Sequence, residues 1–342
     1  MSGILGHDAA ITEFLTAMRG PRMHHAWLIA GPEGVGKAET ATALAKRLLS
    51  EAAGPEIDGD QITVPDNHPI GKLVDAHTHP DFVLLDRLPK DMKALREIER
   101  RDWPRDVERT RNITIEQVRA LSAVFALTPS FSKSRVVLVD SIDDLERGAA
   151  NALLKSLEEP PTGTVFLLVS HAPGRLLPTI RSRCRLLKFD ALDDDGMRVV
   201  LQRSLPGIGD AELAALVAAG QGAPGRALGY AGLDLAGLDG LLRSIAKGGD
   251  PDNLLRAELA QSLSAKSTQR RYEAFLVRAP AFIADHARSL SGRSLVVALD
   301  AWSAAHSLAE SAVRQSLDPQ MTVFALGGYV AGLAPGSPAA KA

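Results

Sequence analysis

Five short apolar segments, separated by stretches of helical pattern, constrain the fold of this chain more than any other feature. Each is four or five residues long. Most are continuously apolar rather than alternating, which is typical of parallel strands covered on both faces. The segments are Ala26–Ala30, Phe82–Leu85, Val136–Val139, Val165–Val169 and Leu186–Phe189. Because parallel strands are joined through right-handed helical crossovers, we expect a three-layer α/β domain with a five-stranded parallel sheet.

Length and composition exclude several classes of protein. With 342 residues, of which 45% are hydrophobic, the chain can bury a large core and is expected to form two or three domains. The net charge of −2 gives no overall attraction to nucleic acid, so any DNA contact must come from a local patch or from partners. The single cysteine excludes internal disulfides and multi-cysteine zinc sites. With no signal-peptide pattern and no long apolar run, these features predict a cytoplasmic protein.

A glycine-rich loop follows the first apolar segment and leads into a helical pattern over Lys37–Leu49. Its candidate nucleotide-binding residues are Gly31, Gly34, Gly36 and Lys37. The glycines allow backbone amides to approach phosphate oxygens, and the lysine neutralises their charge. The next residue is Ala38, where a magnesium-binding loop carries Ser or Thr, and Thr40 comes two residues too late. Two interpretations stay open: nucleotide binding without hydrolysis, and a vestigial loop kept for folding.

The third apolar segment ends in Asp140, the usual position of an acid that directs magnesium. An active ATPase of this type carries Glu next, to polarise water, but here the residue is Ser141. Asp143 and Asp144 follow on the next turn and are expected to be acids at a helix N-terminus. Because the metal hydroxyl and the base are both missing, we expect no hydrolysis by this chain.

The segment Thr179–Cys184 contributes to a run of arginines, Arg181, Arg183 and Arg185, at spacings i, i+2 and i+4. In an extended segment the three would share a face, and in a helix only the outer pair would. Arginine suits the charge that develops on a γ-phosphate, and a finger supplied in trans can raise the rate by about 10³–10⁵-fold. Structural salt bridging is the competing interpretation. Cys184 is expected to be a small buried hydrophobe.

Composition also indicates how the rest of the chain is organised. Residues 51–80 are predicted to be a surface excursion, and 87–111 a charged insertion that is either solvated or contacts DNA or a partner. Thr114–Gln117 is a capping box that opens the next helix. We predict an α/β domain over 1–190, a helical lid over 191–234, a helical bundle over 235–334 and a disordered tail over 335–342.

Taken in chain order, these segments resemble the clamp-loader branch of the AAA+ ATPases. The run His24–Lys37 resembles its phosphate loop, and Asn151–Pro161, with Asn-Ala-Leu-Leu-Lys and Leu-Glu-Glu-Pro-Pro, is highly specific to it. Thr179–Cys184 looks like its Ser-Arg-Cys motif. The resemblance covers roughly residues 3–50, 79–86 and 113–230. It implies that Ser170 is a sensor after the fourth strand and that Arg226, within Gly222–Leu228, is the arginine of the second sensor.

Within this branch, Ala38 and Ser141 are typical of the delta-prime family of bacterial DNA polymerase III. The resemblance implies a stator of a hetero-pentamer with delta and gamma/tau subunits, which opens the sliding clamp and places it on primed DNA. Arg183 would act in trans as the arginine finger that completes the ATP site of the adjacent motor subunit. The C-terminal bundle would join the collar of the ring. The chain would belong to a nucleotidyltransferase holoenzyme, and whether it binds ATP or ADP without hydrolysis stays open.

The chain departs from its relatives after the first helix, where many carry a four-cysteine zinc module. None is present here, so we expect no zinc and no other metal site. The alternative function is an ATP-hydrolysing motor subunit of the gamma/tau type, which would need a hydroxyl at position 38 and a carboxylate at position 141. An unrelated P-loop nucleotide kinase would not explain residues 151–161 or 179–184.

Overall fold

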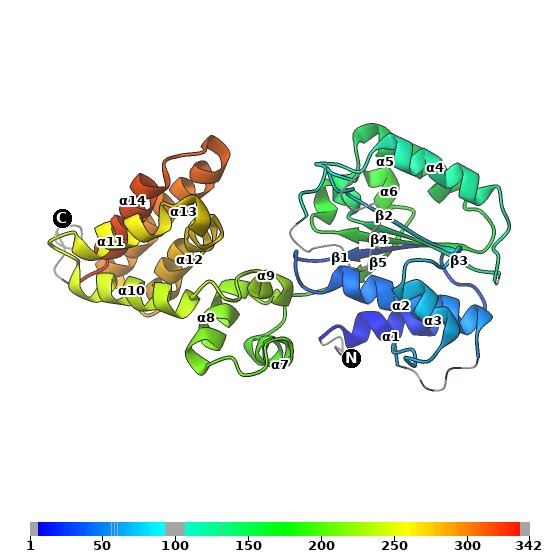
Figure 1. Cartoon of the computed structure of the whole chain (residues 1–342), viewed down its shortest axis with the longest axis horizontal. Helices are drawn as coiled ribbons and strands as arrows, with labels where there is room; N and C mark the ends of the chain where they lie inside the picture. Colours follow the sequence, from blue (N-terminus) through cyan, green and yellow to red (C-terminus); the bar gives the residue numbers. More distant parts are fainter. Residues whose placement is uncertain are drawn as a thin grey trace. The chain divides into compact units, whose positions relative to one another are not determined.

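A computed structural model of the chain describes residues 6–55, 57, 59, 61–92, 107–131 and 133–335. The chain forms two compact units, Met1–Leu192 and Asp193–Ala342. The first contains a sheet with helices on both faces, and the described part of the second is helical (Figure 1). The predicted division of the second unit into a lid and a terminal bundle stays a prediction.

The sheet of the first unit has five strands in the order β2-β3-β4-β1-β5, and all neighbours run parallel. The strands are β1 Ala26–Ala30, β2 Phe82–Asp86, β3 Arg135–Asp140, β4 Thr164–Ser170 and β5 Arg185–Lys188. The predicted five-stranded parallel sheet is therefore confirmed. The expectation of strands covered on both faces is wrong for β5, where Leu186 is 54% exposed because β5 lies at the edge of the sheet.

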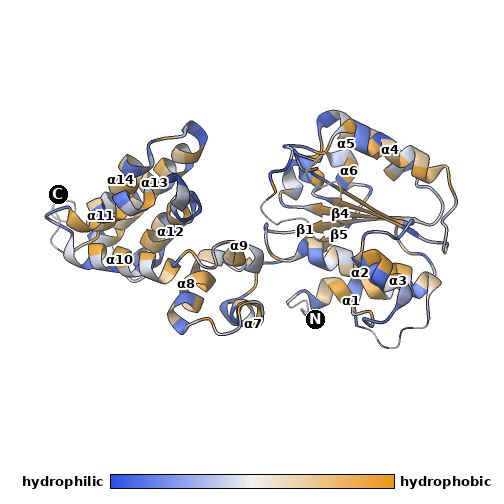
Figure 2. Ribbon diagram, viewed as in Figure 1, coloured by the Kyte–Doolittle hydropathy of each residue, from blue (hydrophilic) through white to orange (hydrophobic). Residues whose placement is uncertain are grey.

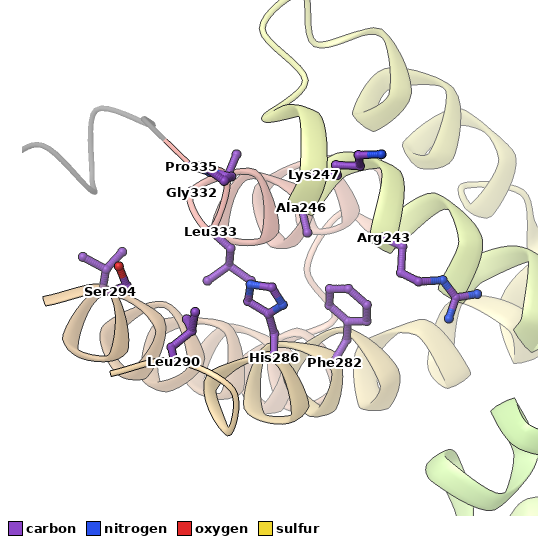
Figure 3. A pocket seen from close by; sticks show the side chains of 12 residues that line it. Arg243, Ala246, Lys247, Phe282, His286, Leu290, Ser294, Gly332, Leu333 and Pro335 are labelled. Carbon is purple, nitrogen blue, oxygen red and sulfur yellow. The ribbon is translucent and has the colours of Figure 1, made fainter. Parts of the chain in front are cut away.

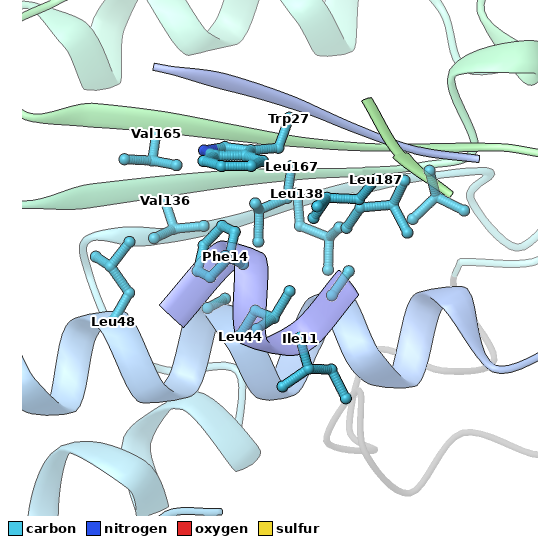
Figure 4. Packing of buried hydrophobic residues seen from close by; sticks show 14 of the residues in the cluster. Ile11, Phe14, Trp27, Leu44, Leu48, Val136, Leu138, Val165, Leu167 and Leu187 are labelled. Atoms are coloured by element: carbon cyan, nitrogen blue, oxygen red, sulfur yellow. The ribbon is translucent and has the colours of Figure 1, made fainter. Parts of the chain in front are cut away.

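Helices cover both faces of this sheet (Figure 1). They are α1 Asp8–Arg19, α2 Lys37–Ala53 and α3 Pro69–Asp75 on one face, and α4 Ile115–Phe125, α5 Arg147–Glu158 and α6 Pro178–Arg181 on the other. Successive residues of β1 point to opposite faces, so Trp27 joins the core with α1 and α2, and Leu28 joins the core with α5. Figure 4 shows Phe14 and Leu44 packed beneath the strands in the first of these cores. Hydrophobic residues dominate the strands in Figure 2.

Local sequence signals set several helix boundaries. Gly36, with a φ of 101°, immediately precedes α2, which runs four residues beyond the predicted Leu49 before Gly54 ends it. The predicted capping box is confirmed, because Thr114 and Gln117 exchange side-chain and backbone hydrogen bonds at the start of α4. At the end of α5, the two prolines that follow Glu159 prevent the helix from continuing.

The predicted surface excursion over 51–80 packs partly into the first unit, where Val64, His68 and Val74 are buried. Arg47 on α2, which the sequence analysis did not single out, holds the first part of this excursion in place. The Arg47 guanidinium is fully buried and uses five hydrogen bonds, which matches its five N–H donors. Its acceptors are the Glu51 carboxylate and the backbone carbonyls of Ile57, Gly59, Gln61 and Thr63.

Much of the charged insertion over 87–111 lies outside the described residues, which resume at residue 107. Its two described ends pair with each other: the Lys90 amide donates to the Glu108 carbonyl at 2.8 Å, and the Thr110 amide donates to the Leu88 carbonyl at 2.7 Å. The role of the insertion stays a prediction. Most of the tail over 335–342 is likewise outside the described residues.

The second unit consists of helices in its described residues. They are α7 Asp194–Ser204, α8 Asp210–Gly220, α9 Pro224–Gly229, α10 Leu235–Gly248, α11 Leu254–Leu263, α12 Gln269–Ala287, α13 Gly292–Gln315 and α14 Pro319–Ala331. A buried ion pair joins α12 to α10, with Arg278 Nε 2.6 Å from Asp239 Oδ1. None of the described helices is both long and apolar enough to cross a membrane.

A hollow of about 680 Å³ lies between α10, α12, the start of α13 and the end of α14. The side chains of Phe282, His286 and Leu333 point toward it, and Arg243 and Lys247 lie along α10 beside it (Figure 3). No described acidic residue pairs with either cation in this structure. The sequence analysis assigned no role to this hollow.

Candidate functional site

The glycine-rich loop keeps the shape of an anion-binding loop. Gly31 has no room for a side chain, because a Cβ there would lie 2.0 Å from the Phe189 carbonyl oxygen. Gly34 and Gly36 adopt φ values of 80° and 101°, which favour glycine. Among the described residues, the amides of Gly34, Gly36, Lys37 and Ala38 make no backbone hydrogen bond. The loop therefore presents unpaired N–H groups at the start of α2, as phosphate binding requires.

Lys37, by contrast, is bound to its own loop. Its side chain is 3% exposed, and Nζ donates to the Gly31 carbonyl at 2.7 Å and to the Pro32 carbonyl at 2.5 Å. Burial lowers the pKa of Lys37 to about 8, although the Asp140 and Glu33 carboxylates act in the opposite direction. The cation predicted to neutralise phosphate thus stabilises backbone carbonyls instead.

The oxygen ligands that a magnesium nucleotide needs are missing or engaged elsewhere. Ala38 has no hydroxyl, and Thr40 cannot replace it, because its Oγ1 donates to the Gly36 carbonyl at 2.8 Å. Ser141, at the position of the water-polarising Glu, donates from Oγ to Asp144 Oδ2 at 3.1 Å. The residues present therefore do not fit the magnesium ion of a hydrolysing ATPase.

The cleft beside the loop has a volume of about 330 Å³ and carries a surplus of acidic groups. Five carboxylates line it, those of Glu33, Glu39, Asp86, Asp140 and Asp144. Burial raises the pKa of Asp140, and the Asp86 and Glu39 carboxylates add to this effect. Two arginines that the sequence analysis left within the charged insertion neutralise part of the surplus: Arg109 lies 2.9 Å from Asp86, and Arg87 lies 3.3 Å from Asp144. Apart from the opposite charges, nothing in the sequence indicated that these two ion pairs would form.

Asp143 and Asp144 were predicted to be acids at a helix N-terminus, but Asp143 also has a second role. Asp143 and Asp144 do lie in a short helical turn, Ile142–Asp144. However, the Asp143 carboxylate accepts hydrogen bonds from Ser170 Oγ at 3.0 Å and from the amides of His171 and Ala172 at 2.6 and 3.3 Å. It therefore fixes the end of β4, and it engages the hydroxyl of the buried Ser170. The sensor role of Ser170 stays a prediction.

The three arginines near position 183 do not share one face, so neither geometry considered from the sequence holds. Arg181 ends α6, Arg183 lies in the following turn, and Arg185 begins β5. Arg185 lies 2.7 Å from Glu13 and stacks over the Trp27 ring at 5.1 Å. None of the described acidic residues pairs with Arg181, which is exposed.

Arg183 has its own set of contacts. Its Nη2 lies 2.7 Å from Glu158 Oε1, and its Nη1 donates to the Thr179 carbonyl at 2.9 Å. The side chain is 34% exposed. Cys184, predicted to be buried, is only partly buried and packs against the core, and burial raises the pKa of this thiol to about 12.

Arg183 and the phosphate loop lie at opposite ends of two neighbouring strands, β5 and β1. β5 runs parallel to β1, with Arg185 opposite Trp27 and Lys188 opposite Ala30. Arg183 therefore precedes the first strand residues, whereas Gly31 follows the last residue of β1. At a strand rise of about 3.3 Å per residue, the step from Trp27 to Gly31 alone spans about 13 Å.

The remaining predicted site residue, Arg226, lies on α9 in the second unit. Its Nη1 donates to Gln221 Oε1 at 3.3 Å. Its assignment to a nucleotide site stays a prediction. Among the described residues, no group of three or more His, Cys, Asp or Glu side chains is placed to hold a metal ion.

Comparison with known proteins extends this description. Residues 6–193 match the protein family described as "DNA polymerase III, delta subunit". The DNA polymerase III subunit delta' of Pseudomonas aeruginosa is 38% identical over 165 residues, which cover 47% of this chain and 41% of that protein. The DNA polymerase III subunit gamma of Buchnera aphidicola is 30% identical over 174 residues, covering 51% of this chain and 40% of that protein.

A solved structure of a DNA polymerase III gamma subunit-related protein from Thermotoga maritima covers 95% of this chain and 100% of its own. Its TM-score is 0.46 and its sequence identity 17%. The chain spans less than half the length of the two curated relatives described above.

Proposed function

The chain belongs to the DNA polymerase III delta subunit family, and on this premise we propose that it is the delta-prime stator of a clamp loader. In this role it does not hydrolyse ATP. It supplies Arg183 to the ATP site of a neighbouring motor subunit, and the assembled ring loads the sliding clamp onto primed DNA.

The observation that carries this proposal is the position of Arg183. Because Arg183 precedes β5 whereas the chain's own phosphate loop follows the neighbouring β1, the two lie at opposite ends of these strands, roughly a strand length apart. Its 34% exposure leaves it accessible to a second molecule. An arginine in this position is suited to act in trans on a developing γ-phosphate charge.

The state of the chain's own cleft supports the other half of the proposal. Ala38 and Ser141 remove the metal hydroxyl and the water-polarising base, and Lys37 is hydrogen-bonded to its own loop. The unpaired amides of the loop still suit an anion, so ATP or ADP bound without hydrolysis is compatible with this role. No step of turnover is assigned to the cleft.

The partners follow from the family. We propose that the chain assembles with gamma/tau and delta subunits into a hetero-pentamer, and that the helical second unit forms its share of a collar. Contact with the sliding clamp and with primed DNA would be made through this complex. The names of the relatives, one a delta' and one a gamma subunit, support a place in such an assembly.

The test is ATP turnover of the reconstituted loader, stimulated by clamp and primed DNA, with Arg183→Ala in this subunit alone. Since a trans finger contributes about 10³–10⁵-fold at the site that it serves, we expect that site to become silent and total turnover to fall. Arg185→Ala is the matched control, because Arg185 is held by Glu13 and Trp27. Unchanged turnover by an intact Arg183→Ala complex would overturn the proposal, and loss with Arg181→Ala instead would move the role to Arg181.

The motor alternative has a separate test. A gamma/tau-like subunit would hydrolyse ATP in its own cleft, and that activity would depend on Lys37. We expect the isolated chain to show no ATP hydrolysis above background. Hydrolysis that Lys37→Ala abolishes would favour the motor function instead.

A further inference from the structure

The contact between Glu158 and Arg183 joins two segments that lie far apart in the sequence. Glu158 is the last residue of α5, and Arg183 lies in the turn between α6 and β5. Glu158 Oε1 is 2.7 Å from Arg183 Nη2, and the two side chains are 48% and 34% exposed. An exposed pair of this kind contributes little to folding stability, so stability alone does not account for it.

The position of Glu158 is unfavourable for the helix that carries it. A carboxylate at a helix C-terminus faces the negative end of the helix dipole, where a cation is preferred. The structure nevertheless fixes this end of α5: Pro160 and Pro161 terminate the helix, and the His25 ring nitrogen Nε2 lies 3.0 Å from the Leu157 carbonyl oxygen. A carboxylate held firmly in an unfavourable place indicates a role outside the helix.

We propose that Glu158 is a positioning residue, which orients the Arg183 guanidinium for the neighbouring subunit. Three contacts hold the guanidinium: Glu158 lies against Nη2, and Nη1 donates to the Thr179 carbonyl and, at 3.4 Å, to Ser182 Oγ. Because arginine has five N–H donors, others remain for the phosphate oxygens of a nucleotide in another subunit. This inference rests on the proposed function, since Arg183 must act in trans for its orientation to matter.

The contact between Glu158 and Arg183 is in place before Arg183 reaches the nucleotide of the neighbouring subunit. It restricts the rotation of a long side chain, so less conformational freedom is lost when the finger reaches the transition state. Removing the Glu158 contact should therefore lower the maximal rate at the neighbouring site while leaving the affinity of that site for ATP unchanged.

The experiment places Glu158→Ala in this subunit of the reconstituted loader and measures stimulated ATP turnover against ATP concentration. We expect kcat at the neighbouring site to fall by up to about 10²-fold with KM unchanged, which is the scale of a displaced catalytic group. Glu158→Gln keeps a hydrogen-bond acceptor and should restore part of the loss. Glu13→Ala is the matched control, because it breaks the other Glu–Arg pair of this segment, also at 2.7 Å, and should leave turnover unchanged.

A double variant separates positioning from a general structural effect. In an Arg183→Ala background, Glu158→Ala should have no further effect, since its action passes through that arginine. An additional loss in this background, or loss of the complex on size exclusion, would overturn the inference. So would unchanged turnover with Glu158→Ala alone when Arg183→Ala is defective. If Arg183→Ala itself has no effect, the proposed function fails instead.

Discussion

The phosphate loop and the Arg183 turn belong to the same sheet, but their polar groups are used in opposite ways. Around the loop, Lys37 is bound to backbone carbonyls and Asp143 to the end of β4. At the Arg183 turn, the guanidinium is held on one side and its remaining donors are available to solvent. The difference indicates that the polar groups around the loop serve the fold, whereas the turn before β5 presents the arginine that we propose acts on a partner.

We predict the largest effect on stability for Arg47, the cation of α2 whose buried side chain makes five hydrogen bonds. Arg47→Met should lower the free energy of unfolding of the first unit by about 3–5 kcal/mol, because it removes all five hydrogen bonds of a buried guanidinium, four of them to backbone carbonyls. Hydrogen exchange of the β4 amides would measure it. Arg19→Met is the control, since Arg19 contacts the same Glu51 from a more exposed position and should cost under about 1 kcal/mol.

Asp143 should give the next effect. Asp143→Ala removes the acceptor of three hydrogen bonds at the end of β4 and should cost about 1–3 kcal/mol. Asp190→Ala, which breaks an exposed pair with Lys188, provides the comparison. If the two variants unfold at the same urea concentration, Asp143 is not part of the fold as described.

Lys37 gives a prediction that depends on pH. In the unfolded chain it holds its proton up to its ordinary pKa of 10.5, but in the folded chain only up to about 8. Unfolding between these values takes up a proton, so the contribution of Lys37 to stability rises with pH in this range. Wild type should gain about 2 kcal/mol over Lys37→Met between pH 8 and pH 10, as measured by urea unfolding. If the stability difference between wild type and Lys37→Met does not change with pH, burial does not lower the pKa of Lys37.

Arg183 should have the smallest effect on stability. Arg183→Ala removes a partly exposed ion pair and should change the free energy of unfolding by less than about 0.5 kcal/mol, measured by thermal or urea unfolding. A loss as large as that of Arg47→Met would remove the contrast between the phosphate loop and the Arg183 turn and make Arg183 a structural residue.

Much of the fold could be predicted because its signals are local. The apolar runs predicted the strands, and the Thr114 capping box predicted the start of α4. The predicted cover of β5 failed because a run of apolar residues does not say which strand lies at the sheet edge.

The functional contacts were harder to predict, because they join residues that are distant in sequence. Nothing in the sequence assigned Glu158 a role beyond its place in the Leu-Glu-Glu-Pro-Pro motif, or Arg109 a role beyond being one charge of the insertion. Arg47 had no signal at all, since four of its five acceptors are backbone carbonyls whose position depends on the folded excursion. The sequence spacing grouped Arg181, Arg183 and Arg185. In the structure they lie on α6, in the turn between α6 and β5, and on β5, and this difference could not be predicted from the spacing.

The most direct test of the central claim is to compare Arg183→Ala and Lys37→Ala in the same reconstituted loader, with ATP turnover stimulated by clamp and primed DNA. If this chain serves a neighbour's site rather than its own, Arg183→Ala should lower turnover at the neighbouring site by about tenfold or more, and Lys37→Ala should leave turnover within about twofold of wild type. The reverse pattern, a large loss with Lys37→Ala and none with Arg183→Ala, would contradict the account.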